Sequence, residues 1–232
     1  MGVQLADLLD VDLLARHVRD GYVSVRDHPE APLQILNYTA AAQYDRAWDD
    51  VTRQCRGLIV HTGWDDVVAR PWPKFHNYGE HEEGTLDLDA LVEVTDKLDG
   101  SLGILYPAAK GQWAIATRGS FESEQAIRGT RMWRDNYSHM RPEPGWTFLF
   151  EIIYPENRIV VDYAGAEDLV LLGAVTPVMI WPMATSMALY LAWVMSYVAA
   201  FSPLKSKVFV NVVPPNALNS VWRATMSSMA FR

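Results

Sequence analysis

Residues 94–102 read Val-Thr-Asp-Lys-Leu-Asp-Gly-Ser-Leu and place a Lys-x-Asp-Gly motif between two hydrophobic runs, residues 91–95 and 102–106. Short runs bounded by Asp-Gly and Lys-Gly turn signals predict strands. Lys97 therefore belongs to a loop between two strands. The motif alone has a second interpretation, a surface turn with a solvated lysine, because roughly one chain of this length in twenty contains it by chance.

Outward from this motif, short β-rich runs continue in both directions. They predict further strands at residues 33–38, 57–61, 67–69, 113–117, 146–153, 158–163 and 169–175. Helical spacing of side chains predicts an amphipathic helix within residues 1–20 and a second helix over residues 122–137. Strands in close succession with few helices indicate an α+β fold built on antiparallel sheets with flanking helices.

The composition of the 232 residues excludes several classes of protein. With 50% hydrophobic and 21% charged residues, the chain is not disordered over its whole length. A single cysteine, Cys55, excludes a disulfide framework, and the six histidines show no metal-ligand spacing, so we assign no zinc. Asp7, Asp10 and Asp12 interrupt the first leucines, which excludes a signal peptide and favours a cytoplasmic location.

Charge divides the chain into two parts. Residues 1–173 carry a net charge of −12, whereas residues 174–232 carry +4 and contain no Asp, Glu, Gly, His or Gln. We therefore interpret residues 1–173 as one domain and residues 174–232 as an atypical apolar tail. The acidic balance of the whole chain, −8, argues against binding to polyanions through bulk charge.

The tail has three interpretations. Residues 178–201 contain no charge, and as a helix they would span about 36 Å, enough for a membrane anchor. A change of reading frame near residue 173 is the favoured interpretation, because no single structural need removes acids, glycine, histidine and glutamine together. An unrecognised soluble appendage is the third.

Lysine chemistry gives the motif around Lys97 a functional meaning. A lysine amine is a nucleophile only when it is deprotonated, which desolvation or a nearby cation favours. Attack on the α-phosphate of a nucleotide would form a lysine–AMP phosphoramidate and release pyrophosphate. Such a site needs cations or backbone N–H groups for the phosphate oxygens, and a carboxylate for the ribose or a metal.

Five segments, in order along the chain, resemble the ATP-dependent RNA ligases of the T-even phage RNA ligase 1 type. This family belongs to the covalent nucleotidyltransferase superfamily of ligases and capping enzymes. The segments are Gln-Cys-Arg-Gly-Leu-Ile-Val at 54–60, Arg-Pro-Trp-Pro-Lys-Phe-His-Asn at 70–77, the lysine motif at 96–106, Thr-Arg-Gly-Ser-Phe-Glu at 117–122, and Phe-Leu-Phe-Glu-Ile-Ile with Pro-Glu-Asn-Arg-Ile-Val at 148–160. The resemblance implies a nucleotide cleft between antiparallel sheets.

The resemblance also implies individual roles. Lys97 would be the catalytic nucleophile that becomes adenylated, and Asp99 and Gly100 would shape its loop. Glu151 would face the adenosine ribose or the metal. The remaining ATP contacts that the resemblance implies are Tyr38, Arg56, Lys74 and Arg118.

Several of these residues also have ordinary structural interpretations. Arg56 and Lys74 are also compatible with plain surface charges, and Tyr38 with core packing. Arg128, Arg131 and Arg134 recur every three residues, so they would either touch RNA phosphates or form a solvated helix face.

The expected function is ATP-dependent joining of RNA ends that carry a 5′-phosphate and a 3′-hydroxyl. The expected cofactor besides ATP is Mg²⁺ or Mn²⁺, and DNA is not expected as a substrate. The family's fourth motif, a Glu-Gly strand, has no counterpart because no acid follows Asp168, and residues 205–207 match only the spacing of its fifth, Lys-x-Lys. We therefore expect weak or absent ligation by this chain. The alternatives are an inactive nucleotide- or RNA-binding remnant and a membrane-tethered protein.

Overall fold

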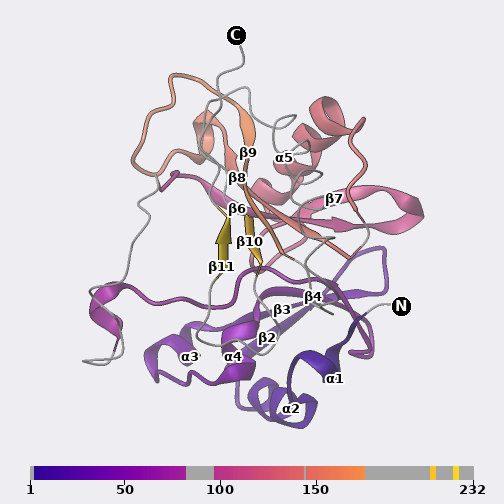
Figure 1. The fold of residues 1–232 in the computed structure, drawn as a ribbon, viewed down its shortest axis with the longest axis vertical. Helices are drawn as coiled ribbons and strands as arrows, with labels where there is room; N and C mark the ends of the chain where they lie inside the picture. The colour runs from indigo at the N-terminus through magenta and orange to yellow at the C-terminus, as the bar shows by residue number, and fades with distance from the viewer. Residues whose placement is uncertain (1–2, 82–96, 144, 176–209, 213–221, 225–232) are drawn as a thin grey trace.

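Two antiparallel sheets form the centre of the structure, and helices cover their outer faces (Figure 1). The structure is a computed structural model that describes residues 3–81, 97–143, 145–175, 210–212 and 222–224. The two sheets and the few helices agree with the predicted α+β class. Every strand pair in the described residues is antiparallel.

The first sheet has the strand order β1-β5-β4-β3-β2. Its strands are β1 (Val3–Gln4), β2 (Val23–Asp27), β3 (Leu33–Tyr38), β4 (Arg56–His61) and β5 (Asp66–Ala69). The helices of this part of the chain are α1 (Leu5–Leu8), α2 (Val11–Arg19), α3 (Ala40–Tyr44) and α4 (Asp50–Gln54). Asp10 caps α2 by accepting a hydrogen bond from the Leu13 N–H at 2.9 Å, which separates α1 from α2.

The second sheet has the strand order β7-β6-β8-β9. Its strands are β6 (Ser101–Pro107), β7 (Trp113–Ala116), β8 (Thr147–Ile153) and β9 (Asp168–Val175). Helix α5 (Glu124–Met132) continues directly into a π-helical turn, η3 (Trp133–Tyr137). The short 3₁₀ turns are η1 (Tyr78–Glu80), η2 (Ala109–Gly111) and η4 (Pro155–Asn157), and β10 (Val210–Val212) pairs with β11 (Trp222–Ala224).

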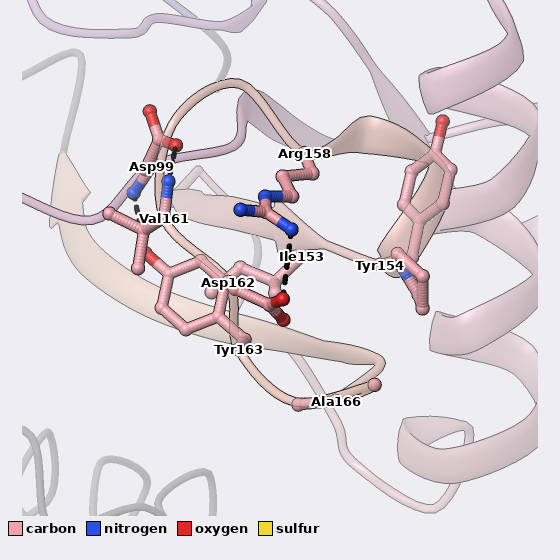
Figure 2. A pocket seen from close by; sticks show the side chains of 10 residues that line it. Asp99, Ile153, Tyr154, Arg158, Val161, Asp162, Tyr163 and Ala166 are labelled. Carbon is pink, nitrogen blue, oxygen red and sulfur yellow. Dashed lines mark hydrogen bonds and ion pairs between the residues drawn. The ribbon is translucent and has the colours of Figure 1, made fainter.

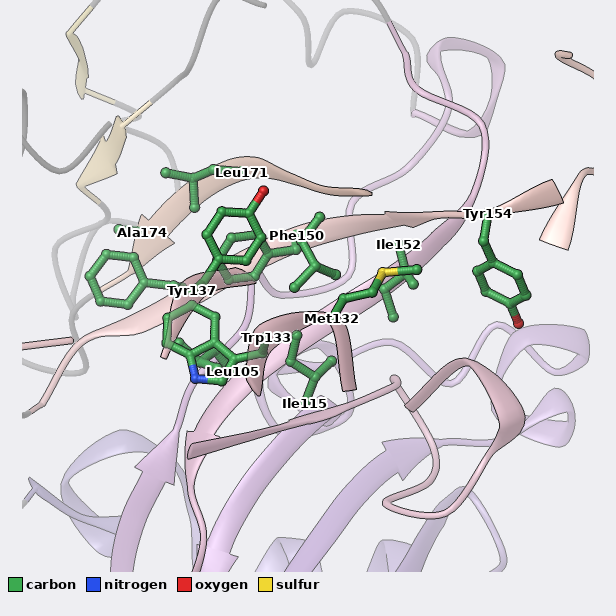
Figure 3. Packing of buried hydrophobic residues seen from close by; sticks show 12 residues of the cluster. Leu105, Ile115, Met132, Trp133, Tyr137, Phe150, Ile152, Tyr154, Leu171 and Ala174 are labelled. Carbon is green, nitrogen blue, oxygen red and sulfur yellow. The ribbon is translucent and has the colours of Figure 1, made fainter. Parts of the chain in front are cut away.

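Three hydrophobic clusters hold these layers together. One lies between the first sheet and helices α1, α2 and α4, and one joins the inner faces of the two sheets. The third lies between the second sheet and α5 with η3, where Phe150 is fully buried (Figure 3). Truncating such a buried aromatic side chain to alanine costs about 3–5 kcal/mol.

Side-chain alternation along β8 determines which way Glu151 faces. Phe148, Phe150 and Ile152 belong to the cluster under α5, whereas Leu149 belongs to the cluster between the sheets. Glu151 shares the face of Leu149, because residues two apart in a strand point the same way. Its carboxylate is therefore directed toward the first sheet.

Most of the predicted strands are confirmed, with boundaries within one residue. The prediction of a strand at residues 158–163 is wrong: this segment is a loop, and two of its backbone N–H groups bind a side chain instead of a neighbouring strand. The single helix predicted within residues 1–20 is two helices. The elements that were not predicted are β1, β2, α3, α4, β10 and β11. Residues 91–95 lie outside the described part of the chain.

No helix among the described residues is long and apolar enough to cross a membrane. Residues 178–201, for which an anchor was one interpretation, lie outside the described residues.

Candidate active site

Lys97 lies in the extended segment that leads into β6, and its side chain is exposed. Three residues later, Gly100 passes very close to β8. A Cβ atom added at Gly100 would lie 2.5 Å from the backbone oxygen of Ile152 and 3.2 Å from Cγ of Glu151. Only glycine allows this approach, which holds the lysine segment against the strand that carries Glu151.

Asp99 fixes the lysine segment to the loop that follows β8. Its Oδ2 accepts hydrogen bonds from the N–H groups of Val160 at 2.6 Å and Val161 at 2.7 Å, and its own N–H donates to the Tyr163 hydroxyl at 2.7 Å. The backbone hydrogen bonds from Val160 and Val161 lower the pKa of the Asp99 carboxyl below its usual value. The aspartate therefore acts as an ionised clamp two residues after Lys97.

Glu151 is the acid that faces this segment. Burial raises the pKa of the Glu151 carboxyl, and the N–H of Gly100 and the positive charge of Lys97 oppose that effect. Leu102 of β6 lies directly opposite Glu151 in the sheet, so the carboxylate and the lysine segment share one end of the β6–β8 pair. The arrangement places a half-buried carboxylate within electrostatic reach of an exposed amine.

Arg56 reaches the same region because of a bulge in β4. Leu36 pairs with Leu58 and Asn37 with Arg56, so Gly57 is an extra residue, with φ of +89°. The extra residue shifts the alternation, so Arg56 takes the face directed toward the second sheet. Burial lowers the pKa of the Arg56 guanidinium, while Tyr38 raises it and Arg118 lowers it further.

Gly57 itself touches the second sheet. A Cβ atom there would lie 2.6 Å from Cδ1 of Ile104 and 3.1 Å from Cα of Arg118. We expect Gly57→Ala to lower the free energy of unfolding by about 1–3 kcal/mol, because it adds backbone strain and a clash. Denaturant unfolding measures this loss.

Gly21→Ala is the matched control for Gly57→Ala. Gly21 also has a positive φ, +79°, but a Cβ atom there would have nothing within 4 Å. Gly21→Ala should lower the free energy of unfolding by less than Gly57→Ala does, since only backbone strain contributes at Gly21. Equal losses in the two variants would contradict the contact between Gly57 and the second sheet.

Arg118 and Tyr38 connect the two sheets at this site. Nη1 of Arg118 donates a hydrogen bond to the Tyr38 hydroxyl at 2.8 Å, and its guanidinium carbon lies 5.1 Å from the centre of the tyrosine ring. Tyr38 ends β3 and is 6% exposed, whereas Arg118 lies in the exposed turn closed by the bridge between Thr117 and Ser120. The pair therefore links an exposed cation that follows β7 to a buried tyrosine of the first sheet.

Lys74 lies in the segment after β5, and Trp48 lies between it and Tyr38 in a chain of contacts. Its side chain is 13% exposed, and Nζ lies 5.4 Å from the centre of the Trp48 ring and 3.7 Å from Oε2 of Glu80. Nζ also donates to the backbone oxygen of Phe75 at 2.5 Å. The Trp48 ring in turn meets the Tyr38 ring edge-on, with 5.0 Å between the ring centres.

The structure thus brings together the residues for which the sequence predicted ATP contacts. Lys97, Asp99, Gly100 and Glu151 form one group at the end of the β6–β8 pair. The second group, in which neighbours are linked by direct contacts, contains Tyr38, Trp48, Lys74 and Arg118. Arg56 joins the two groups, because Glu151, Tyr38 and Arg118 all influence the pKa of its guanidinium.

The arginines predicted to contact RNA are placed differently. Arg128 makes a two-pronged ion pair with Glu167, at 2.8 and 2.7 Å, and its guanidinium carbon lies 5.4 Å from the centre of the Tyr154 ring. Arg131 and Arg134 are exposed on α5 and η3. Arg128 is therefore engaged in holding the loop after β8 to α5, and an RNA phosphate would have to compete with Glu167.

A cavity of about 160 Å³ opens next to the Asp99 clamp, on the side of the loop after β8 (Figure 2). Among the predicted ATP contacts, only Asp99 lines it. The Arg158–Asp162 ion pair, at 2.8 Å, and the ring of Tyr163 form part of its wall. The cavity is therefore distinct from the region of Arg56, Tyr38 and Arg118.

Metal binding can be judged from the donors at the site. Within the described residues, no three His, Cys, Asp or Glu side chains group closely enough to hold a metal ion on their own. Mg²⁺ in phosphate-transfer sites is commonly held by one or two carboxylates together with substrate phosphates and water. Glu151 fits that pattern as a single carboxylate donor.

Two residues of the site were not predicted from the sequence, Trp48 and Tyr163. Tyr163 contacts the backbone of the lysine motif through one hydroxyl, a link between residues 64 apart that no local pattern signals. Trp48 lies in a polar loop, where an aromatic residue next to acids is the only hint.

Tyr163→Phe removes the acceptor for the Asp99 N–H and leaves the ring in place. If the lysine segment serves a reaction at Lys97, we expect the rate of that reaction to fall about tenfold while the melting temperature changes by a few degrees at most. Rate and thermal unfolding are measured on the same samples. Tyr44→Phe, at a residue that is 90% exposed, should leave both unchanged, and an unchanged rate in Tyr163→Phe would contradict the role of this hydrogen bond.

Comparison with known proteins assigns these segments to one family. Residues 54–197, more than half of the chain, match the family model described as RNA ligase. The match includes the segments around Arg56, Lys74, Lys97, Arg118 and Glu151, and it continues past residue 173.

Two of three individual relatives are named as RNA ligases. The chain is 33% identical over 127 residues to a "Putative RNA ligase" of Thermovibrio ammonificans, covering 51% of this chain and 33% of the relative. It is 31% identical over 112 residues to a "Putative bifunctional polynucleotide kinase/RNA ligase" of Autographa californica nuclear polyhedrosis virus, covering 44% of this chain and 16% of that protein. It is 29% identical over 156 residues to "Uncharacterized protein ORF64" of Ostreid herpesvirus 1, covering 62% of this chain and 38% of that protein. The chain therefore spans well under half the length of these relatives.

Proposed function

The chain belongs to the RNA ligase family that its residues 54–197 match, and from this premise we propose that it is an ATP-dependent adenylyltransferase that forms a lysyl-AMP intermediate on Lys97 as the first step of joining RNA ends. The joining itself should be weak or absent in this chain, because the family's Glu-Gly strand has no counterpart and its Lys-x-Lys motif is matched only in spacing. The observation that carries the proposal is the convergence of Lys97, Glu151, Arg56 and Arg118 from two sheets. An amine is a candidate nucleophile, a carboxylate is a candidate metal ligand, and two arginines are candidates for stabilising phosphate charge.

In the first step, the deprotonated Nζ of Lys97 attacks the α-phosphorus of ATP. A P–N bond forms, the bond to the bridging oxygen breaks, and pyrophosphate leaves with that electron pair, while the amine proton passes to solvent. Arg56 and Arg118 stabilise the negative charge that develops on the phosphate oxygens. The Asp99 clamp and the close approach of Gly100 hold the amine in line for this attack.

In the second step, a 5′-phosphate oxygen of RNA attacks the adenylyl phosphorus and frees Lys97. In the third, a 3′-hydroxyl attacks the activated 5′-phosphate: the phosphodiester P–O bond forms, the P–O bond to AMP breaks, AMP leaves with that electron pair, and the hydroxyl proton passes to solvent. Because residues 1–173 carry a net charge of −12, RNA phosphates must rely on local cations such as Arg118, Arg131 and Arg134.

Glu151 would hold Mg²⁺ or Mn²⁺ jointly with the phosphates of ATP. The bound ion would supply positive charge that neutralises the triphosphate and assists departure of pyrophosphate. The half-buried position of Glu151, and the raised pKa of its carboxyl, suit a carboxylate that gains a cationic partner when substrate arrives.

The first step is tested by incubating the purified chain with α-labelled ATP and Mg²⁺, then denaturing the chain and resolving it on a gel. We expect label that stays with the chain, is lost in acid and is released by added pyrophosphate. Labelling with α-labelled GTP in a parallel sample should be weaker. ATP binding without any covalent label would contradict the proposal and indicate a nucleotide-binding remnant instead.

A further inference from the structure

Trp48 occupies a short connection between two helices whose ends are both capped. At the end of α3, Ala47 N–H donates to the Ala42 carbonyl at 2.9 Å and Arg46 has φ of +53°, a left-handed helix stop. At the start of α4, Asp49 accepts hydrogen bonds from the N–H groups of Val51 and Thr52. The backbone on both sides of Trp48 is therefore fixed.

The indole makes its contacts with groups of the candidate active site. Its ring meets Tyr38 edge-on, with 5.0 Å between centres and an angle of 88°. Lys74 places its ammonium 5.4 Å from the ring centre, and His76 meets the ring at 5.7 Å. One side chain thus touches two candidate nucleotide contacts that lie 36 residues apart in the sequence.

Packing of the hydrophobic core does not account for this position. The side chains that form or border the three clusters of the described residues do not include Trp48, although they include Trp64, Trp72, Trp113, Trp133 and Trp146. A cation over an indole face is held electrostatically, and an edge-on ring pair fixes the orientation of both rings. The contacts of Trp48 therefore restrict Lys74 and Tyr38 before any ligand arrives.

We propose that Trp48 is a positioning residue of the nucleotide site: its indole holds the Lys74 ammonium and the Tyr38 ring in the arrangement that receives ATP. This inference rests on the proposed function, since it assigns these two residues to ATP. Loss of the indole removes one restraint from each of these two side chains, so ATP binding weakens because more of their ordering must then accompany binding. The chemical step at Lys97, to which Trp48 has no direct contact in the described structure, changes much less.

The test compares the parent chain with Trp48→Ala, Trp48→Phe and Trp113→Ala. Trp113 is a matched control: it is a partly buried tryptophan that borders a cluster at the far end of the β6–β7 hairpin, opposite Pro107. Initial rates of labelling by α-labelled ATP give KM and kcat, calorimetry gives the Kd for ATP, and thermal unfolding reports stability.

We expect Trp48→Ala to raise KM and Kd for ATP about tenfold while kcat changes less than about threefold. Trp48→Phe should recover most of the affinity, because phenylalanine retains an aromatic face for Lys74 and an edge for Tyr38. Trp113→Ala should lower the melting temperature and leave KM and Kd unchanged.

Unchanged affinity in Trp48→Ala, an equal loss in Trp113→Ala, or no recovery in Trp48→Phe would overturn the inference. Its failure can be separated from that of the proposed function. A parent chain that binds ATP without covalent label contradicts the lysyl-AMP proposal, while the Kd values still decide the role of Trp48. A parent chain that neither binds ATP nor becomes labelled overturns both.

Discussion

Lys97→Arg is expected to abolish covalent labelling by α-labelled ATP, a loss of at least about a thousandfold. Arginine keeps the positive charge and nearly the length of lysine, but its guanidinium stays protonated at any pH the protein tolerates. It therefore has no free electron pair with which to attack phosphorus. Gel-based labelling at saturating ATP measures the effect.

The charge-conserving change separates chemistry from binding. Because the Lys97 side chain is exposed, we expect Lys97→Arg to leave the melting temperature within about a degree or two of the parent value. Its Kd for ATP should also stay within about threefold of the parent value, since the charge is kept. Covalent labelling that survives in this variant would place the nucleophile elsewhere.

Glu151→Gln is expected to lower the rate of labelling by about a hundredfold or more while making the chain more stable at neutral pH. The amide keeps an acceptor for the N–H of Gly100 but loses the charge that would hold a metal ion with ATP. Labelling rates over a range of Mg²⁺ concentrations should show that the loss is not recovered at high Mg²⁺.

The stability effect has a defined dependence on pH. Burial raises the pKa of Glu151 in the folded chain above its usual value of 4.5, so the folded state retains a proton that the unfolded state has released. Stability contributed by this group is present below about pH 4.5 and is lost as pH rises through the folded-state pKa. Glu151→Gln has no carboxyl to titrate at this position, so it does not lose this stability as pH rises.

Melting temperatures of the Glu151→Gln variant and the parent, measured from pH 4 to pH 7, test this sign. The difference, variant minus parent, should be smallest near pH 4 and should grow toward pH 7. Leu149→Ala, at the fully buried residue two positions earlier on the same face of β8, is a control whose difference should not grow with pH. A melting-temperature difference between Glu151→Gln and the parent that shrinks as pH rises would contradict the buried environment assigned to the carboxyl.

The strands could be predicted from the sequence because short hydrophobic runs bounded by turn residues carry a strong local signal. The loop at residues 158–163 could not be predicted, since the composition of Ile159, Val160 and Val161 is typical of a strand. Their structure is decided by a carboxylate 61 residues away, Asp99, which takes two backbone N–H groups. Local pattern cannot reveal a competing partner so distant in the sequence.

Most residues of the candidate site were proposed from the sequence because their motifs resemble those of a known family, whereas Trp48 and Tyr163 were not. The way in which these residues converge in the structure could not be predicted from the sequence. The direction of Arg56 depends on the bulge at Gly57, and the contact between Lys74 and Tyr38 passes through Trp48, which belongs to none of the motifs. The direction of Arg56 follows from the extra residue Gly57 in β4. The position of Trp48 follows from the connection between α3 and α4, which is capped at both ends.

The most direct test of the central claim is the position of the nucleotide on the labelled chain. The chain is incubated with ATP and Mg²⁺ and digested at neutral pH to protect the phosphoramidate, and its peptides are sequenced by mass spectrometry. We predict one adenylyl group, on Lys97. An adenylyl group on another residue such as Lys74, or a chain that binds ATP and carries none, would contradict the account.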